Sequence, residues 1–418
     1  MKLANNKRQS GRLKTLVVSG ITLTVFATNT LAQTTQNKMK EVNPFKINIE
    51  QSVLNDLKTR LKQTRWPDSD EQAGWSQGTN KVYLQQLVNY WADTYDWKKQ
   101  EAILNSFPQY TAEIDGITIH FLHIKGKGKN PKPLILTHGW PDSFYRFHKI
   151  IPLLTDPAAH GGNADQSFDV IIPSIPGFGF SDRKPQTSAA VADLWEKLMT
   201  DVLGYKTFVA AGGDIGSSVT KSLALRHPNE VEAIHLTDVG YPTGQEDFST
   251  MTKEEQEFAG FVQGWWFKEG AYAMVQMTKP QSLAYGLNDS PAGWAAWVLN
   301  FGSAGAPPEA IESAFGGRDE LLTNIMIYWV TQTIGSSARM YLIDAQGQYG
   351  DSNMGTKKST PPAGIALFPR EAQFPKEWAE RSVTVTSYKK MPKGGHFAAL
   401  EEPKIFADEL RTFFYQKK

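Results

Sequence analysis

The sequence predicts an α/β protein in which helices flank a mostly parallel β-sheet. Two observations lead to this prediction. Short apolar segments of strand length alternate with amphipathic helical segments over most of the 418 residues, and such alternation is typical of a parallel sheet covered on both faces. Residues 241–335 interrupt it with a helical, tryptophan-rich pattern that contains no clear strand. We expect this stretch to form a helical lid over the carboxyl edge of the sheet, where α/β proteins bind ligands.

Residues 1–32 have the order of a secretory signal peptide. Basic residues lead into an apolar run from Leu16 to Ala27, and Thr30 and Ala32 suit the positions three and one before a signal-peptidase cut. The apolar run is shorter than the roughly 20 residues of a membrane-spanning helix. We therefore expect export to a periplasm or the medium, without stable membrane association after cleavage. An uncleaved N-terminal anchor is the alternative.

The next segment, residues 43–125, is predicted to begin with helices and to end in a hairpin. Leucines at three- and four-residue spacing predict a helix over residues 54–65, and an aromatic-rich stretch predicts a second helix over residues 83–97. Residues 111–124 alternate in hydropathy about Asp115-Gly116, which is typical of a β-hairpin. The segment could cover the lid or form a homodimer interface, and the sequence leaves both open.

The sheet is expected from residues 126–240 and 336–418, on either side of the lid. Its strands read as short, nearly continuous apolar runs, which is the pattern of a buried parallel sheet. The predicted strands cover residues 133–137, 169–173, 206–211, 231–237, 364–368 and 383–388. The predicted helices among them cover residues 191–202, 217–226 and 405–415.

Composition excludes several classes of function. The formal net charge is +1, and no long basic run follows the first forty residues, which argues against nucleic acid as a partner. The chain contains no cysteine, so cysteine nucleophiles, thiolate metal sites and disulfides are excluded.

The segment Gly212-Gly213-Asp214-Ile215-Gly216 lies between a predicted strand and a predicted helix. Small residues around one reactive residue at this place are the pattern of a nucleophile elbow, in which glycines permit a sharp turn. The reactive residue is Asp214, and a carboxylate suits attack on an electrophilic sp3 carbon of an epoxide or an alkyl halide, which leaves an ester. Alternatively, Asp214 caps the helix that follows.

The segment Thr137-His138-Gly139-Trp140-Pro141 directly follows another predicted strand. In hydrolases with a nucleophile elbow, this loop supplies one backbone N–H of the oxyanion hole, and the residue after the nucleophile supplies the other. We expect the N–H groups of Trp140 and Ile215 to have these roles. The alternative is an ordinary loop between a strand and a helix.

A histidine, His396, lies in a glycine-rich loop after the last predicted strand and before the last helix. This is the chain order of the base in a nucleophile–acid–base triad. Glu371, after the penultimate strand, is the favoured acid to orient the histidine, and Asp238, after the preceding strand, is its competitor. Either carboxylate could instead be a solvated loop residue.

Together these segments resemble the microsomal-type epoxide hydrolases of the α/β-hydrolase superfamily, including their N-terminal segment. The resemblance extends from about Asn43 to Tyr415 and implies the α/β-hydrolase fold. It rests on Arg65-Trp66-Pro67, His138-Gly139-Trp140-Pro141, Gly213-Asp214-Ile215-Gly216, Tyr272 with Gln276 to Pro280, Leu287 to Pro291, Phe368-Pro369-Arg370-Glu371 and Gly394-Gly395-His396-Phe397.

The resemblance implies a role for each candidate residue. Asp214 matches the nucleophile, Glu371 the orienting acid and His396 the base. Tyr272 and Tyr341 match the two lid tyrosines, and a phenol can donate a hydrogen bond to the oxygen of an opening epoxide. The implied substrate is a small-molecule epoxide, and the implied chemistry requires no metal and no organic cofactor.

Two other functions fit parts of the pattern. A haloalkane dehalogenase also uses an aspartate nucleophile, but its usual halide-binding tryptophan directly after the nucleophile is replaced here by Ile215. A catalytically inactive binding protein of the same fold would have at least one altered catalytic position, and all five positions are intact.

Overall fold

The computed structural model describes residues 41–70, 72–302, 310–348 and 360–416. These described residues form one compact unit. The predicted signal peptide lies outside the described residues. Among the residues that are described, no helix has both the length and the hydropathy needed to span a membrane.

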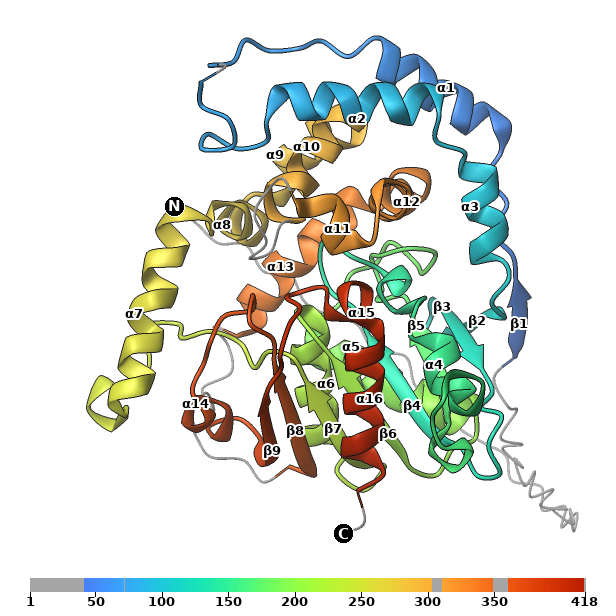
Figure 1. Ribbon diagram of the computed structural model, residues 1–418, viewed down its shortest axis with the longest axis vertical. Helices are drawn as coiled ribbons and strands as arrows, with labels where there is room; N and C mark the ends of the chain where they lie inside the picture. Colours follow the sequence, from blue (N-terminus) through green and yellow to red (C-terminus); the bar gives the residue numbers. More distant parts are fainter. Residues whose placement is uncertain (1–40, 71, 303–309, 349–359, 417–418) are drawn as a thin grey trace, which may run out of the picture. The chain divides into compact units, whose positions relative to one another are not determined.

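A mixed β-sheet forms the centre of this unit (Figure 1). In the described part of the chain it has nine strands in the order β1-β2-β3-β5-β4-β6-β7-β8-β9. The strands from β5 to β9 pair in parallel, whereas β3, β2 and β1 extend the β5 edge in antiparallel fashion. The strands are β1 (Val42–Phe45), β2 (Gln109–Ile114), β3 (Ile117–Ile124), β4 (Lys132–Thr137), β5 (Phe168–Pro173), β6 (Phe208–Gly212), β7 (Val231–Leu236), β8 (Pro362–Leu367) and β9 (Thr384–Lys390).

Helices cover both faces of this sheet. On one face α5 (Ser188–Lys197) packs beside α6 (Ile215–Arg226), and on the other face α4 (Ile151–Thr155) contacts α16 (Pro403–Phe414) (Figure 1). Every residue of β5 is buried, as expected of a strand covered on both sides. The α/β fold and the mostly parallel sheet predicted from the sequence are confirmed.

The N-terminal segment differs from the sequence prediction at two places. The single helix predicted over residues 83–97 is wrong, because the chain forms α2 (Lys81–Asp93) and then α3 (Trp97–Leu104). The side chain of Asp96 accepts a hydrogen bond from the N–H of Lys99 at 3.2 Å, and such a cap starts a new helix. The short edge strand β1 was not predicted; it pairs with β2.

The other N-terminal predictions agree with the structure. Helix α1 (Gln51–Lys62) buries its leucine stripe. Strands β2 and β3 form the predicted hairpin, with Asp115 and Gly116 at φ values of 52° and 75°. Positive φ at both central residues is the geometry of the tight turn that matches strand twist.

Helices α7 to α13 form the lid. In the described part of residues 241–335 no strand occurs. The lid was predicted to end at residue 335, but its last helix, α13, begins inside this range and continues beyond that residue. The lid helices are α7 (Lys253–Lys268), α8 (Ala271–Thr278), α9 (Pro280–Asp289), α10 (Pro291–Gly302), α11 (Ile311–Phe315), α12 (Arg318–Thr331) and α13 (Ile334–Gln348).

The N-terminal segment packs on the lid. Hydroxyl groups from the first part of the chain reach acceptors more than 200 residues later, and Figure 1 shows α1 and α2 beside α10. The hydrogen bonds run from Thr79 to the carbonyl of Ala296 at 2.6 Å, from Tyr83 to Glu312 at 2.9 Å and from Tyr90 to Asp319 at 2.8 Å. The structure shows that this segment covers the lid, and the homodimer interface stays a prediction.

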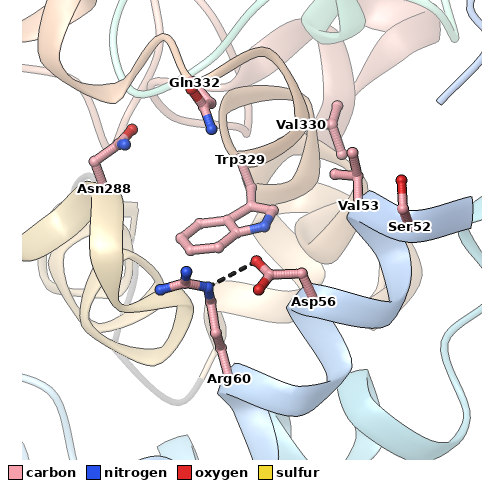
Figure 2. Close-up of a pocket in the computed structure, with 8 residues that line it drawn as sticks. All are labelled: Ser52, Val53, Asp56, Arg60, Asn288, Trp329, Val330 and Gln332. Carbon is pink, nitrogen blue, oxygen red and sulfur yellow. Dashed lines mark hydrogen bonds and ion pairs between the residues drawn. The ribbon is translucent and has the colours of Figure 1, made fainter. Parts of the chain in front are cut away.

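A surface pocket of about 290 Å³ lies where α1 meets the lid (Figure 2). Arg60 of α1 donates to Asp56 at 2.7 Å and to the carboxylate of Asp289 at 2.8 Å. It also donates to the carbonyl of Asp289, at the end of α9. Trp329 and Gln332 border the pocket from the lid. Arg60 therefore ties the N-terminal segment to the carbonyl end of a lid helix.

Candidate active site

Asp214 lies at the sharp turn between β6 and α6. Its φ of 59° and ψ of −132° are rare for a residue other than glycine. The turn needs small neighbours: a Cβ on Gly216 would lie 2.1 Å from the carbonyl oxygen of Thr137, and one on Gly212 would lie 2.3 Å from that of Gly216. Strand and helix therefore approach closely, and the backbone holds Asp214 in a strained conformation of the kind that gathers at functional sites.

The two oxygens of the Asp214 carboxylate have different surroundings. Oδ1 accepts hydrogen bonds from the N–H of Trp140 at 2.8 Å and from the N–H of Ile215 at 2.7 Å. Oδ2 faces Nε2 of His396 at 3.6 Å. Asp214 therefore caps α6, as the alternative interpretation proposed, and at the same time presents one oxygen to a histidine.

The histidine is held by Glu371, not by Asp238. Nδ1 of His396 lies 2.8 Å from the carboxylate of Glu371, which also accepts from the N–H of Ala372 at 3.0 Å. Glu371 follows β8 and His396 follows β9, so the ends of adjacent strands bring them together. Asp238 lies after β7 and binds the backbone of the elbow instead.

The charges of His396, Glu371 and Asp214 shift one another's pKa values. Burial alone would lower the pKa of His396, but the carboxylates of Glu371 and Asp214 raise it to about 9 against repulsion from Arg146. Burial opposes ionisation of Glu371, yet the charge and hydrogen bond of His396 lower its pKa overall. Burial raises the pKa of Asp214, while His396 and the N–H of Trp140 oppose this rise.

Two lid tyrosines lie close enough to Asp214 for its charge to act on both. Tyr272 of α8 and Tyr341 of α13 have ring centroids 6.3 Å apart. The ring of Trp140 stacks on Tyr272 at 5.3 Å and meets Tyr341 edge-on at 6.0 Å. Burial and the charge of Asp214 raise the pKa of Tyr272; burial and the neighbouring Tyr272 raise that of Tyr341. Both phenols therefore stay neutral and can donate hydrogen bonds.

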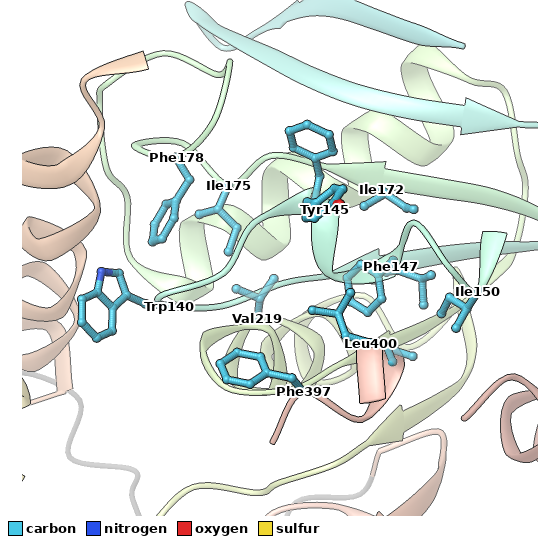
Figure 3. Close-up of a cluster of buried hydrophobic side chains, with 14 of the residues drawn as sticks. Trp140, Tyr145, Phe147, Ile150, Ile172, Ile175, Phe178, Val219, Phe397 and Leu400 are labelled. Carbon is cyan, nitrogen blue, oxygen red and sulfur yellow. The ribbon is translucent and has the colours of Figure 1, made fainter. Parts of the chain in front are cut away.

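A buried hydrophobic cluster lies beneath these loops (Figure 3). Trp140 and Phe397 are 2% and 0% exposed. Figure 3 shows them in one cluster with Val219, a buried residue of α6. Trp140 supplies a backbone donor of the site, and Phe397 directly follows His396. Packing of these two rings therefore fixes the backbone that presents the polar groups.

The sequence prediction missed a buried ion pair beside the site. Asp142 and Arg146 have side-chain exposures of 1% and 3%, and they form a salt bridge. Their i, i+4 spacing just after the predicted oxyanion loop was the available signal, but it is also the spacing of exposed helix pairs. In the described residues, no group of three or more potential ligands that could hold a metal ion occurs.

The site can thus bring a carboxylate oxygen, two backbone donors, two phenols and a histidine–glutamate pair to one place. A carboxylate in this setting can attack a carbon and form an ester, and the histidine can activate water against that ester.

Comparison with known proteins places this geometry in context. Residues 42–147 match the family described as "Epoxide hydrolase N terminus", and residues 132–276 match "alpha/beta hydrolase fold". A Stigmatella aurantiaca protein named "Putative epoxide hydrolase" is 44% identical over 90% of this chain and 85% of its own length. Epoxide hydrolase 1 of Sus scrofa is 36% identical over 90% of this chain and 88% of its own length.

Solved structures show the same likeness. The juvenile hormone epoxide hydrolase of the silkworm Bombyx mori superposes with a TM-score of 0.79 at 29% identity, covering 89% of this chain and 93% of that one. The Aspergillus niger epoxide hydrolase superposes with a TM-score of 0.76 at 27% identity, covering 90% and 97%.

Proposed function

The chain belongs to the epoxide hydrolase family, and from this premise we propose how its residues convert an epoxide to a vicinal diol. The enzyme is a hydrolase that acts on the ether bond of an epoxide. The proposal concerns the covalent route through Asp214 and the role of each neighbouring group.

In the first half-reaction, Oδ2 of Asp214 attacks a ring carbon of the epoxide and the carbon–oxygen bond breaks. The departing oxygen is a poor leaving group unless it is protonated or hydrogen-bonded. Tyr272 and Tyr341 donate to it, and one phenol proton passes to the alkoxide. The product is a hydroxyalkyl ester on Asp214.

In the second half-reaction, His396 removes a proton from water, and the resulting hydroxide attacks Cγ of Asp214. Esterification removes the negative charge of Asp214, one of the charges that raise the pKa of His396, so the imidazolium can release its proton and become a base. This proton replaces the one that the phenol gave up. The N–H groups of Trp140 and Ile215 hold the oxyanion on Oδ1. The bond between Cγ and Oδ2 then breaks, and the diol leaves with Oδ2 and a proton from His396. The new carboxylic acid of Asp214 returns its proton to His396, which restores the carboxylate and the imidazolium.

The main support for this proposal is that the two carboxylate oxygens of Asp214 have different partners. Both backbone donors engage Oδ1, so the oxygen that will carry negative charge in the tetrahedral intermediate already has its partners. Oδ2 faces His396, and within the described part of the chain both backbone donors to this carboxylate engage the other oxygen. Oδ2 is therefore the attacking oxygen, and the oxyanion hole requires no rearrangement between the two half-reactions.

The test is single-turnover mass spectrometry of a His396→Gln variant with styrene oxide. The ester should accumulate as a mass increase equal to that of the epoxide, on the peptide that contains Asp214. Asp214→Ala should abolish turnover and show no increase. Full activity of Asp214→Ala, or an adduct on another peptide, would exclude the proposed route. Halide release from a chloroalkane by the parent enzyme would instead favour dehalogenation.

We also propose that the enzyme is exported and that its chain is cut after Ala32. The support is the basic lead and the short apolar run of residues 1–32. Cell fractionation and N-terminal sequencing test this. A mature chain beginning at Gln33 outside the cytoplasm is expected, and a full-length chain that sediments with membranes would indicate the anchor.

A further inference from the structure

Arg146 and Asp142 form an ion pair that is almost completely withdrawn from water. Their side chains are 3% and 1% exposed. Burial opposes ionisation of Asp142, yet the charge of Arg146 lowers its pKa to about 2. Burying two charges costs more than their attraction usually returns, so a stabilising role alone is a weak explanation for the pair.

The contacts of the pair reach three separate loops of the active site. Oδ1 of Asp142 accepts from the N–H of Gly139 at 2.7 Å, in the loop whose next N–H holds Asp214. Nη1 of Arg146 donates to Asp142, and Nη2 donates to the backbone carbonyl of His396. The same Nη2 lies beside the elbow, since a Cβ on Gly213 would be 3.1 Å from it.

We propose that the Asp142–Arg146 pair is a positioning device that fixes the oxyanion loop, the elbow and the histidine loop relative to one another. Neither side chain contacts a reacting atom, so neither is a catalytic residue. The pair acts through Gly139 on the donor of Trp140, and through the carbonyl of His396 on the base.

The geometry explains why an arginine is needed. A guanidinium is planar and donates in two directions at once, here to a carboxylate and to a carbonyl. The ring of Phe397 lies 5.5 Å from the guanidinium carbon and supports it from one side. An ammonium group would keep the charge but could not reproduce both contacts with the same geometry.

The arginine also acts on the base through its charge. His396 faces the carboxylates of Glu371 and Asp214, which raise its pKa, and Arg146, which lowers it. Arg146 also lowers the pKa of Glu371. Loss of Arg146 should therefore raise the pKa of His396 in the ester as well as in the free enzyme, and shift ester hydrolysis to more alkaline pH, an effect that a purely structural role would not produce.

Other contacts keep the oxyanion loop attached when the pair is removed. Nδ2 of Asn324 in α12 donates to the carbonyl of Pro141 at 2.6 Å, and the hydroxyl of Tyr328 donates to the carbonyl of Asp142. Variants of the pair can therefore fold with the lid in place. A double variant, Asp142→Asn with Arg146→Met, leaves no buried charge without its partner.

The experiment measures both half-reactions with styrene oxide in the full chain, for Arg146→Met, Arg146→Lys and the double variant. The rates of ester formation and ester hydrolysis are followed from neutral pH to above the free-enzyme pKa of about 9, because the pKa of His396 is lower in the ester, where Asp214 carries no charge. Arg381→Met is the matched control, because Arg381 forms a partly buried pair with Glu255 in α7.

Arg146→Met and the double variant should slow ester hydrolysis by about a hundredfold, the effect of displacing a reacting group by about 1 Å, with an alkaline shift of the pH profile. Arg146→Lys should keep the parent profile and recover part of the rate, and Arg381→Met should change only stability. Parent rates and pH profiles in the double variant would overturn the proposal, as would a change in melting temperature alone. The inference rests on the Asp214 ester; if no ester forms in the His396→Gln variant either, the proposed route has failed rather than the positioning role.

Discussion

The carboxylate of Asp238 accepts a hydrogen bond from the backbone N–H of Asp214 at 2.5 Å. The same oxygen accepts from the hydroxyl of Ser217 at 2.9 Å. A second carboxylate thus supports the elbow from behind while Glu371 holds the histidine. Burial, together with the charges of Glu371 and Asp214, raises the pKa of Asp238 from 3.8 to about 6.

This raised pKa predicts the pH dependence of an Asp238→Asn variant. Below about pH 4 Asp238 is protonated in both the folded and the unfolded chain. Between about pH 4 and about pH 6 only the folded chain retains the proton, so the parent loses stability as pH rises. The Asn side chain does not titrate, so the variant does not lose this stability. The free energy of unfolding of the variant minus that of the parent should therefore increase by on the order of 3 kcal/mol across this interval. Denaturant unfolding at several pH values measures the difference, and a constant difference would show that Asp238 is not perturbed.

Glu371→Gln should separate orientation of the histidine from its acidity. The Glu371 carboxylate is the strongest influence that raises the pKa of His396, so its loss should move the pH profile of ester hydrolysis toward lower pH. The maximal rate should fall by about a thousandfold, because the imidazole loses its partner. Single-turnover kinetics at several pH values test both effects. Asp238→Asn serves as the control, and an acid shift there instead would identify Asp238 as the partner of His396.

Tyr272→Phe and Tyr341→Phe should slow ester formation by about a hundredfold each and leave ester hydrolysis unchanged, since the phenols act on the departing oxygen. The stacking of Trp140 on Tyr272 at 5.3 Å offers a fluorescence signal for stopped-flow measurement. Tyr285→Phe, at a residue of α9 that is 73% exposed, is the matched control. Equal slowing of both half-reactions would point to a general disturbance of the lid.

Gly139→Ala should block the first half-reaction. A Cβ at this position would lie 2.2 Å from Oδ1 of Asp214, so the loop or the carboxylate must move. Ester formation should fall by at least about a hundredfold. Gly264→Ala is the control, because among the described residues no atom outside the local helix backbone and the two chain neighbours lies within 4 Å of a Cβ there. Normal ester formation by Gly139→Ala would mean that the oxyanion loop moves without cost.

The sequence was sufficient to predict the elements that follow a strong pattern. The apolar strands, the elbow around Asp214 and the loop at Trp140 all appeared at the predicted places. The choice between Glu371 and Asp238 required the structure, because each carboxylate follows a strand of the same sheet and the sequence does not show which strand end faces His396. The edge strand β1 escaped prediction because proline and asparagine make it resemble a loop.

The sequence also did not show which charged residues are buried. Asp142 and Arg146 have the spacing and chemistry of a solvated helix pair, and only the folded chain shows that both are buried and that Phe397 lies against the guanidinium. The division of the second predicted helix at Asp96 has a similar cause, since the aromatic pattern continues across the break and the cap becomes visible only from its hydrogen bond.

The packing of the N-terminal segment on the lid has a consequence for how this enzyme is made. Tyr83 and Tyr90 bond to partners 229 residues later in the chain. Synthesis proceeds from the N-terminus, so the residues of α1 and α2 are made well before those of the lid surface on which they pack. Contacts of such sequence separation form slowly. We therefore expect docking of this segment to be a late step of folding, completed only after the lid has closed over the sheet.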